Sequence, residues 1–173
     1  KENKNEAQKI HNIPAKKIEI TGSPFFDKWL NKDLLLDEET FKRNLGLKAN
    51  EKYILYLGSS ANIAKDETWI IQEIYDQIKK EKNAYSNNLK IIARPHPANY
   101  KKFQELELLN SNKLTIFPKE FSLPESFESQ RIFYNSVYYS ESVVGVNTSG
   151  MLDSIIMNKI TISYISDKYK NTQ

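Results

Sequence analysis

The stretch VVGVNTSGMLDSIIMNKITISYIS, Val143 to Ser166, decides the fold of this 173-residue chain. It starts with an apolar, strand-forming run at Val143–Val146, continues with a helical pattern and ends in a second apolar strand at Ile160–Ile165. Two apolar strands joined by a helix predict a pair of parallel strands with a crossover helix. A polar corner, Asn147-Thr148-Ser149-Gly150, lies where the first strand meets the helix. Such residues cap helices, but a helix start with small polar residues also binds anions, so both uses stay open.

The same alternation of strand and helix runs through the rest of the chain. Further strands are expected at Lys17–Thr21, Tyr53–Ser60, Leu89–Pro97 and Leu114–Phe117. Helices are expected at Lys1–Asn12, Asp37–Leu45 (with Gly46 as C-cap), Lys65–Lys82, Ala98–Leu109 and Glu128–Ser140. Trp69, Ile70, Ile74 and Ile78 have helical spacing and should face the core. Because the strands have no polar face, the pattern predicts a Rossmann-like three-layer α/β/α sandwich with a mostly parallel sheet.

The composition excludes several classes of protein. The 39% hydrophobic and 27% charged residues are typical of a globular domain, and the net charge is only +3. The lysines are interspersed with acids and form no basic stripe, so the sequence favours no nucleic-acid partner. There are no cysteines and two histidines, which exclude disulfides and disfavour a metal site, and the cytoplasm is the expected compartment. The chain lacks an initial Met and ends soon after a strand, so we expect a piece of a longer protein, with any membrane association through other parts.

Ligands of open parallel sheets bind beyond the carboxyl ends of the strands, so the residues at these ends are the candidates for a site. They are Gly22 and Ser23; Gly58, Ser59 and Ser60; Arg94, His96 and Asn99; and Asn147, Thr148, Ser149 and Gly150. An arginine forks onto phosphate oxygens, hydroxyls donate hydrogen bonds, and glycine lets the backbone approach. Together these residue types predict a phosphate-binding edge.

Each of these residues also has an ordinary structural explanation. The Gly58–Ser60 stretch could be a simple turn, and Arg94 and His96 could lie in a surface loop. Prolines on both sides of His96 favour a fixed ring position instead. Asp153, one helical turn after Ser149, could be a solvated carboxylate or an acceptor for ribose hydroxyls. The sequence contains no Walker A motif, no GxGxxG motif and no recognisable catalytic triad.

Four segments in order carry a resemblance to a known family: KIEITGSPFFD, YILYLGSS, ARPHPAN and GVNTSGMLDSIIMNKITIS. With them the chain resembles the C-terminal, nucleotide-sugar-binding lobe of a GT-B type glycosyltransferase. More narrowly, it is similar to the bacterial envelope-polysaccharide group that includes CDP-glycerol glycerophosphotransferase-like and capsule-synthesis proteins. The resemblance implies that residues 1–16 are the tail of a preceding lobe or a linker helix, and that residues 17–173 form the donor-binding lobe.

The resemblance also implies roles for single residues. Thr148, Ser149 and the amides that open their helix would bind the donor diphosphate, with Asn147 and Gly150 in the same corner and Gly58, Ser59 and Ser60 close by. Asp153 would stand where such folds usually place a ribose-binding Glu. Arg94 and His96 would neutralise or protonate the leaving phosphate. The donor would be a nucleotide-sugar or a CDP-glycerol-like compound bound without a metal or cofactor, its base read by loops such as Phe117–Phe121. The acceptor and general base would lie on a missing N-terminal lobe.

Two other interpretations stay open. A UDP-N-acetylglucosamine 2-epimerase-like enzyme shares the two-lobe architecture and the Thr-Gly-Asn/Ser-Pro linker. That family more often has a Ser-Gly-Gly turn followed by a Glu pair, where this chain has NTSGMLD. A non-catalytic regulatory or assembly domain of the same fold is the third possibility.

Overall fold

The computed structural model describes residues 2–106, 111–119 and 125–172. The chain divides into two compact units, Lys1–Asn31 and Lys32–Gln173. The family resemblance implies a boundary after residue 16. The first unit contains the expected N-terminal helix, α1 (Glu2–Lys9), and two 3-10 turns, η1 (Ala15–Lys17) and η2 (Pro24–Leu30).

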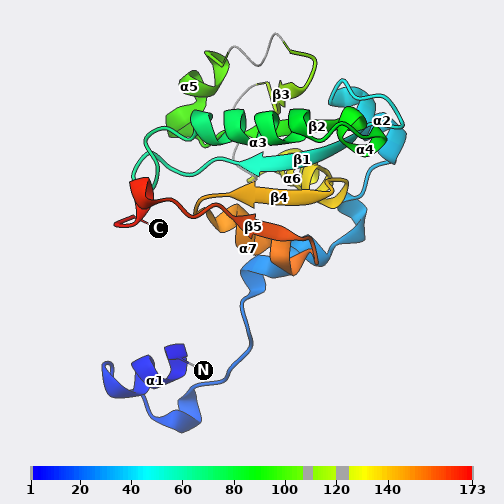
Figure 1. Cartoon of the computed structure of the whole chain (residues 1–173). Helices are drawn as coiled ribbons and strands as arrows, with labels where there is room; N and C mark the ends of the chain where they lie inside the picture. Colours follow the sequence, from blue (N-terminus) through cyan, green and yellow to red (C-terminus); the bar gives the residue numbers. More distant parts are fainter. Residues whose placement is uncertain (1, 107–110, 120–124, 173) are drawn as a thin grey trace. The chain divides into compact units, whose positions relative to one another are not determined.

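The second unit is built on a five-stranded sheet in which every pairing is parallel (Figure 1). Its strands are β1 (Lys52–Leu57), β2 (Leu89–Arg94), β3 (Leu114–Ile116), β4 (Ser142–Gly145) and β5 (Thr161–Ser163), in the spatial order β3-β2-β1-β4-β5. Together with the helices on the sheet, this confirms the predicted Rossmann-like α/β sandwich.

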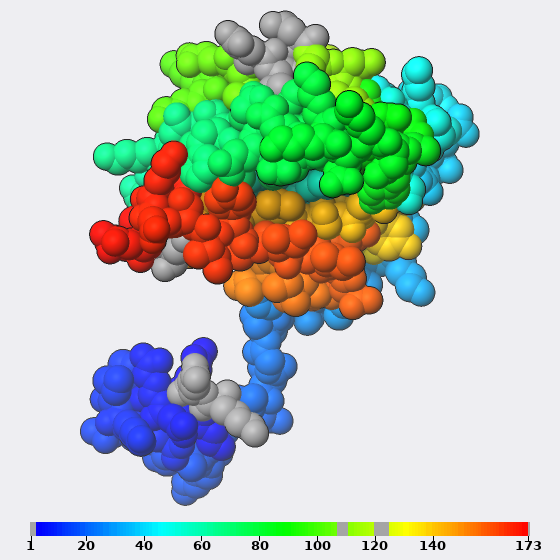
Figure 2. All heavy atoms as spheres, in the orientation of Figure 1, coloured from blue at the N-terminus to red at the C-terminus, as the bar shows by residue number. Residues whose placement is uncertain are grey.

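Helices cover both faces of the sheet. They are α3 (Thr68–Lys80) and α5 (Tyr100–Gln104) on one face, and α6 (Phe127–Tyr138) and α7 (Ser149–Ile156) on the other. The side chains of β1 alternate between the two faces. Tyr56 packs in one cluster with Ile70 of α3 and Phe103 of α5. On the other face, the Tyr53 hydroxyl donates a hydrogen bond to the Ser136 carbonyl of α6 at 2.8 Å. Ile70 is fully buried, which confirms the core face expected for this helix. The space-filling view shows α3 and α4 (Ala84–Asn88) as a continuous layer over the first face (Figure 2).

The helix α2 (Glu38–Asn44) forms where the sequence predicts it. The side chain of Asp37 accepts a hydrogen bond from the Thr40 amide at 2.8 Å and so caps the first turn. Gly46, with φ +75°, follows the helix in the left-handed conformation that a C-cap requires.

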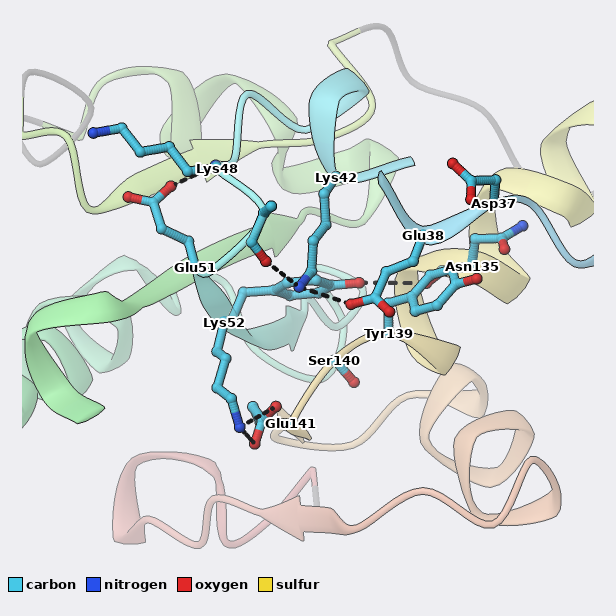
Figure 3. A network of polar contacts seen from close by, with 12 residues as sticks. Asp37, Glu38, Lys42, Lys48, Glu51, Lys52, Asn135, Tyr139, Ser140 and Glu141 are labelled. Atoms are coloured by element: carbon cyan, nitrogen blue, oxygen red, sulfur yellow. Dashed lines mark hydrogen bonds and ion pairs between the residues drawn. The ribbon is translucent and has the colours of Figure 1, made fainter. Parts of the chain in front are cut away.

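Ion pairs cluster around the amino ends of the strands (Figure 3). Lys42 lies 2.8 Å from Glu38 and donates to the Ala49 carbonyl at 3.1 Å. Glu51 is paired with Lys90 at 3.2 Å, and both side chains are nearly buried. Burial raises the pKa of Glu51, but the hydrogen bonds from the Lys48 amide and from Lys90 outweigh it and hold that pKa below its usual value. Ligands of parallel sheets bind at the opposite edge, so we assign this network to stability.

The structure differs from two expectations about secondary structure. The predicted strand at Lys17–Thr21 is wrong: η1 takes its first residue and the rest forms neither helix nor strand, with Ile20 56% exposed. An alternating five-residue pattern forms a strand only beside a partner strand, and this segment has none in the described ranges. The predicted helix at Ala98–Leu109 is a 3-10 turn, η4 (Pro97–Asn99), followed by α5, and residues 107–109 lie outside the described part.

No helix within the described ranges combines the length and the apolar character needed to span a membrane.

The buried side chain of Asn135 gives a test of the packing between α6 and the turn η3 (Lys32–Leu34). Its Nδ2 donates to the Leu34 carbonyl at 2.7 Å, and its Oδ1 accepts from the Leu36 amide at 2.8 Å. Replacing Asn135 with Ala removes both hydrogen bonds and leaves the Leu34 carbonyl and the Leu36 amide without this partner. The free energy of unfolding in urea should therefore fall by about 2–4 kcal/mol. The exposed Asn62 is the matched control, and Asn62→Ala should change it by less than about 0.5 kcal/mol. Equal effects of the two substitutions would contradict this role.

Candidate functional site

The strand order reverses between β1 and β4, and this reversal creates the candidate site. β1 continues along the sheet to β2 and β3, after which the chain returns to place β4 on the other side of β1. Leu57 at the end of β1 is paired with Gly145 at the end of β4. In open parallel sheets the crevice at such a reversal is where ligands bind.

The structure brings three of the four predicted groups of residues to this edge. The Gly58 amide donates to the Arg94 carbonyl at 2.9 Å, and the Asn147 amide donates to the Ser59 hydroxyl at 3.2 Å. The turns after β1, β2 and β4 are therefore in direct contact. Gly22 and Ser23 do not follow a strand, because the strand expected before them does not form.

The turn after β1 is held from several sides. Ser59 is fully buried; its amide donates to Glu67 Oε1 at 2.7 Å and its carbonyl accepts from Asn99 Nδ2 at 3.1 Å. Asn99 also donates to the Ala64 carbonyl at 2.8 Å. Ser59 thus forms the floor of the crevice, while Ser60 is partly exposed at its rim.

Gly58 is required by the close approach of the loop after β2. A Cβ at this position would lie 2.9 Å from the backbone nitrogen of His96 and 3.0 Å from the Cα of Pro95. Both atoms belong to the backbone and cannot rotate away, so only glycine fits here without moving the loop.

Arg94 is the cation of the site. It ends β2 with 9% of its surface exposed, and its guanidinium carbon lies 5.5 Å from the centre of the Phe133 ring on α6. Burial lowers the pKa of Arg94 to about 10, so the side chain remains charged at neutral pH. The Phe133 ring also borders Gly150 of α7, because a Cβ there would lie 3.5 Å from two ring atoms. One aromatic ring therefore contacts both Arg94 and the first turn of α7.

His96 is oriented by its own loop. Its Nδ1 accepts a hydrogen bond from the Ala98 amide at 3.3 Å, so the neutral imidazole carries its hydrogen on Nε2. Burial lowers the pKa of His96, which favours this neutral form at pH 7. The ring can donate a hydrogen bond through Nε2 to a ligand.

The polar corner after β4 opens α7. Thr148 occupies the N-cap position with extended backbone angles (φ −146°, ψ 146°), but its side chain makes no capping hydrogen bond. The first turn of a helix leaves backbone amides without intrahelical acceptors and carries a partial positive charge. Asn147 and Ser149 are exposed, and Gly150 is half-buried. The corner is thus the start of a helix, as predicted, and the Thr148 hydroxyl does not cap it.

A hollow of about 500 Å³ lies beside this corner, between α7 and the end of β5. Its polar rim is formed by Asn147, Thr148, Ser149 and Ser163, and its apolar wall by Val146, Met151, Leu152, Ile155 and Ile165. Leu152 and Ile155 are each 56% exposed. The polar residues of the corner therefore face open space.

Asp153 lies one turn into α7, as its spacing predicts, but its side chain is only 6% exposed. A ribose-binding carboxylate has to be reached by the ligand, so this burial limits such a contact. The ribose role of Asp153 therefore stays a prediction.

Glu67 is the residue of the site that the sequence did not reveal. It stands in an acidic segment before a helix, a pattern typical of a solvated first turn. Nothing in the sequence indicates that this carboxylate is fully buried against Tyr56 and Ser59. Of the loop expected to read the base, Phe117–Phe121, the last two residues lie outside the described ranges.

The assembled site suits an anionic ligand. It combines a helix start, exposed hydroxyls, a charged arginine and an imidazole with a free Nε2–H. Within the described ranges, no group of three or more His, Cys, Asp or Glu side chains is placed to hold a metal ion.

Comparison with known proteins shows the fold. No protein-family description and no curated sequence matches the chain. Among solved structures, the wall teichoic acid polymerase TagF is similar over 98% of this chain, with a TM-score of 0.55 and 15% identity. The UDP-GlcNAc 2-epimerase from Methanocaldococcus jannaschii is similar over 92%, with a TM-score of 0.60 and 17% identity. A structure of that epimerase with UDP-GlcNAc and UDP is similar over 89%, with a TM-score of 0.56 and 17% identity.

Both proteins have the GT-B fold, which confirms the predicted resemblance at the level of fold. The chain spans 39% of the polymerase, and 43% and 41% of the two epimerase structures.

The two glycines of the site give a matched pair of substitutions. Gly58→Ala should lower the free energy of unfolding by about 1–3 kcal/mol and shift the amide resonance of His96, because the new Cβ meets backbone atoms. Gly150→Ala should cost less than about 1 kcal/mol, since its nearest neighbour is the movable Leu57 Cδ1 at 3.1 Å. Urea unfolding and ¹⁵N NMR measure both. Equal losses for the two variants would disprove the close approach at Gly58.

The titration of His96 tests the surroundings of its ring. In a His11→Gln background, NMR should give a pKa for His96 below about 6.5, the usual value for histidine. Because burial lowers the folded-state pKa, the neutral ring favours folding at high pH, and this stability is lost as the pH falls through the unfolded and then the folded pKa. A pKa above 6.5 would show that the ring is not desolvated as the structure has it.

Proposed function

We propose that Lys32–Gln173 is the donor-binding lobe of a transferase of bacterial surface polysaccharide synthesis. The enzyme would move a glycosyl or glycerophosphate group from a nucleotide-activated donor. The observation that carries this proposal is the start of α7, whose N-cap side chain makes no capping bond, at the β1/β4 reversal beside Arg94 and His96. The likeness of the fold to two GT-B proteins supports it.

The donor diphosphate would be bound by Thr148, Ser149 and the first amides of α7. When a nucleotide-sugar reacts, its sugar C–O bond breaks and negative charge grows on the departing nucleoside diphosphate. When a CDP-glycerol-like donor reacts, the bond between its two phosphates breaks and the charge grows on the departing CMP. Preorganised amides, hydroxyls and a cation stabilise this charge more strongly in the transition state than in the ground state. We expect this stabilisation to need no metal ion or other cofactor.

Arg94 and His96 would act on the leaving phosphate. Arg94 supplies a permanent positive charge near the helix start, and its low exposure strengthens the interaction with an anion. His96, neutral with its hydrogen on Nε2, would donate a hydrogen bond to a phosphate oxygen. Ser60 would add a hydroxyl at the rim of the crevice.

The reaction would require a second lobe. The chain spans only 39% of the polymerase structure and 43% of the epimerase structure. We propose that a preceding lobe of the same protein supplies the acceptor site and the general base. This lobe alone would bind the nucleotide weakly and catalyse nothing, on the cytoplasmic side of the membrane.

A 2-epimerase-like enzyme is the second candidate, favoured by the TM-score of 0.60 to the UDP-GlcNAc 2-epimerase. It would use the same nucleotide site. A product assay on a protein with both lobes separates the two, because an epimerase converts a nucleotide-sugar without an acceptor. A non-catalytic domain of this fold would bind no nucleotide.

Nucleotide binding tests the proposal directly. Titrating the ¹⁵N-labelled chain with CDP, UDP and GDP should shift the amides of Ser60, Thr148, Ser149 and Gly150 for at least one nucleotide. Ser149→Ala should weaken that affinity about tenfold, the loss expected for one hydrogen bond to a charged group. Ser142→Ala, at the amino end of the same strand-helix unit, is the control and should leave the affinity unchanged.

Two results would decide against the proposal. No response to any of the three nucleotides would sink both the transferase and the epimerase candidates. Equal affinities of the wild type and Ser149→Ala would remove the start of α7 from the binding site.

A further inference from the structure

Glu67 is a buried charge-bearing group that the proposed function does not use. It occupies the N-cap position of α3 and is fully buried. Its side chain makes no capping hydrogen bond to its own helix. Instead, Oε2 accepts from the Tyr56 hydroxyl at 2.8 Å and Oε1 accepts from the Ser59 amide at 2.7 Å. The carboxylate is therefore directed toward the turn after β1.

This burial is unfavourable for the carboxylate by itself. Desolvation raises the pKa of Glu67, although the hydrogen bonds from Tyr56 and Ser59 oppose the rise. Apolar side chains of similar volume often stabilise a core as well as a buried ionic group does. A carboxylate at this position is best explained by the two donors that it fixes.

The hydrogen bonds continue from Ser59 to the other turns of the site. The Ser59 carbonyl accepts from Asn99 in the loop after β2, and its hydroxyl accepts from the Asn147 amide in the corner after β4. The Ser59 backbone is thus held on one side by Glu67 and on the other by Asn99, while its side chain contacts the corner that opens α7. Through Ser59, Glu67 is connected to all three turns.

We propose that Glu67 is a positioning residue of the nucleotide site. By fixing the Ser59 backbone, Glu67 maintains the hydrogen bond from the Asn147 amide to the Ser59 hydroxyl. This hydrogen bond sets the positions of Ser60 and the start of α7 relative to each other. Glu67 itself does not contact the ligand. The inference rests on the proposed nucleotide binding. In it, Glu67 maintains the distance between the two sides of the phosphate site, Ser60 and the start of α7.

The test compares substitutions that differ in the acceptor they keep. Glu67→Gln retains a carbonyl oxygen for the Ser59 amide, and the Tyr56 hydroxyl can accept from its NH₂ group. Glu67→Ala removes both acceptors. Asn135→Ala is the control for stability, because it should destabilise the fold to a similar degree at the amino end of the sheet.

Binding of CDP, UDP and GDP is measured by ¹⁵N NMR at a temperature where circular dichroism shows every variant folded. Glu67→Ala should weaken the affinity about tenfold. The figure is taken by analogy from metal sites, where removing a side chain that orients a ligand lowers the affinity at least about tenfold. Glu67→Gln should restore it to within about threefold, and Asn135→Ala should leave it unchanged. A purely structural role would instead give Glu67→Ala and Asn135→Ala the same affinity.

Hydrogen exchange of the Ser59 and Asn147 amides, measured without nucleotide, tests the positioning separately. Both amides should exchange faster in Glu67→Ala than in Asn135→Ala. If the wild type binds no nucleotide, the proposed function fails, whereas unchanged exchange overturns the positioning role alone. The role of Glu67 is also overturned if Glu67→Ala keeps wild-type affinity while Ser149→Ala loses it. If Glu67→Ala does not fold, Tyr56→Phe replaces it, and wild-type affinity and exchange in that variant would overturn the inference.

Discussion

The reversal of strand order between β1 and β4 is the constraint on which the rest of this structure depends. Crossovers between parallel strands are right-handed, so the direction in which the chain moves along the sheet decides which face its helices cover. From β1 to β3 the chain moves one way, and α3 and α5 cover one face; from β4 to β5 it moves the other way, and α7 covers the opposite face. The helices therefore separate at the carboxyl ends of β1 and β4. This separation leaves the crevice where Ser60 and Ser149 are accessible.

The two edges of the sheet are organised differently. At the amino ends, charged side chains are paired with one another, as Lys42 is with Glu38 and Lys90 with Glu51. At the carboxyl ends, buried polar groups hold the backbone of the turns, while hydroxyls and helix amides remain at the surface. Charges that are already paired stabilise the fold but cannot bind a ligand strongly. Donors that are held in place without a partner bind an anion with little reorganisation, which is the arrangement that transition-state stabilisation requires.

The donor-binding lobe that we propose would be suited to binding and incomplete for catalysis. In the proposed transferase, the residues around the crevice would stabilise charge on the leaving phosphate group, and a preceding lobe would supply the acceptor site and the general base. In the proposed enzyme the work would be divided between two lobes, because closure of one lobe on the other would exclude water and assemble the reacting groups only when both substrates are bound. The likeness to GT-B structures more than twice as long as this chain agrees with that division.

The sequence alone determined the five strands of the sheet, the main helices and the positions of Gly58, Arg94 and Thr148 at strand ends, because apolar periodicity and turn residues are local properties. It failed at Lys17–Thr21, where the alternating pattern had no partner strand. It also missed the burial of Glu67 and Asp153, whose neighbours in sequence resemble those of solvated helix residues. Burial depends on which elements pack together, and the hydrogen bonds of Glu67 to Tyr56 and Ser59 exist only once α3 lies on β1. The tertiary structure alone therefore decided which polar residues form the floor of the crevice and which line the open hollow beside it.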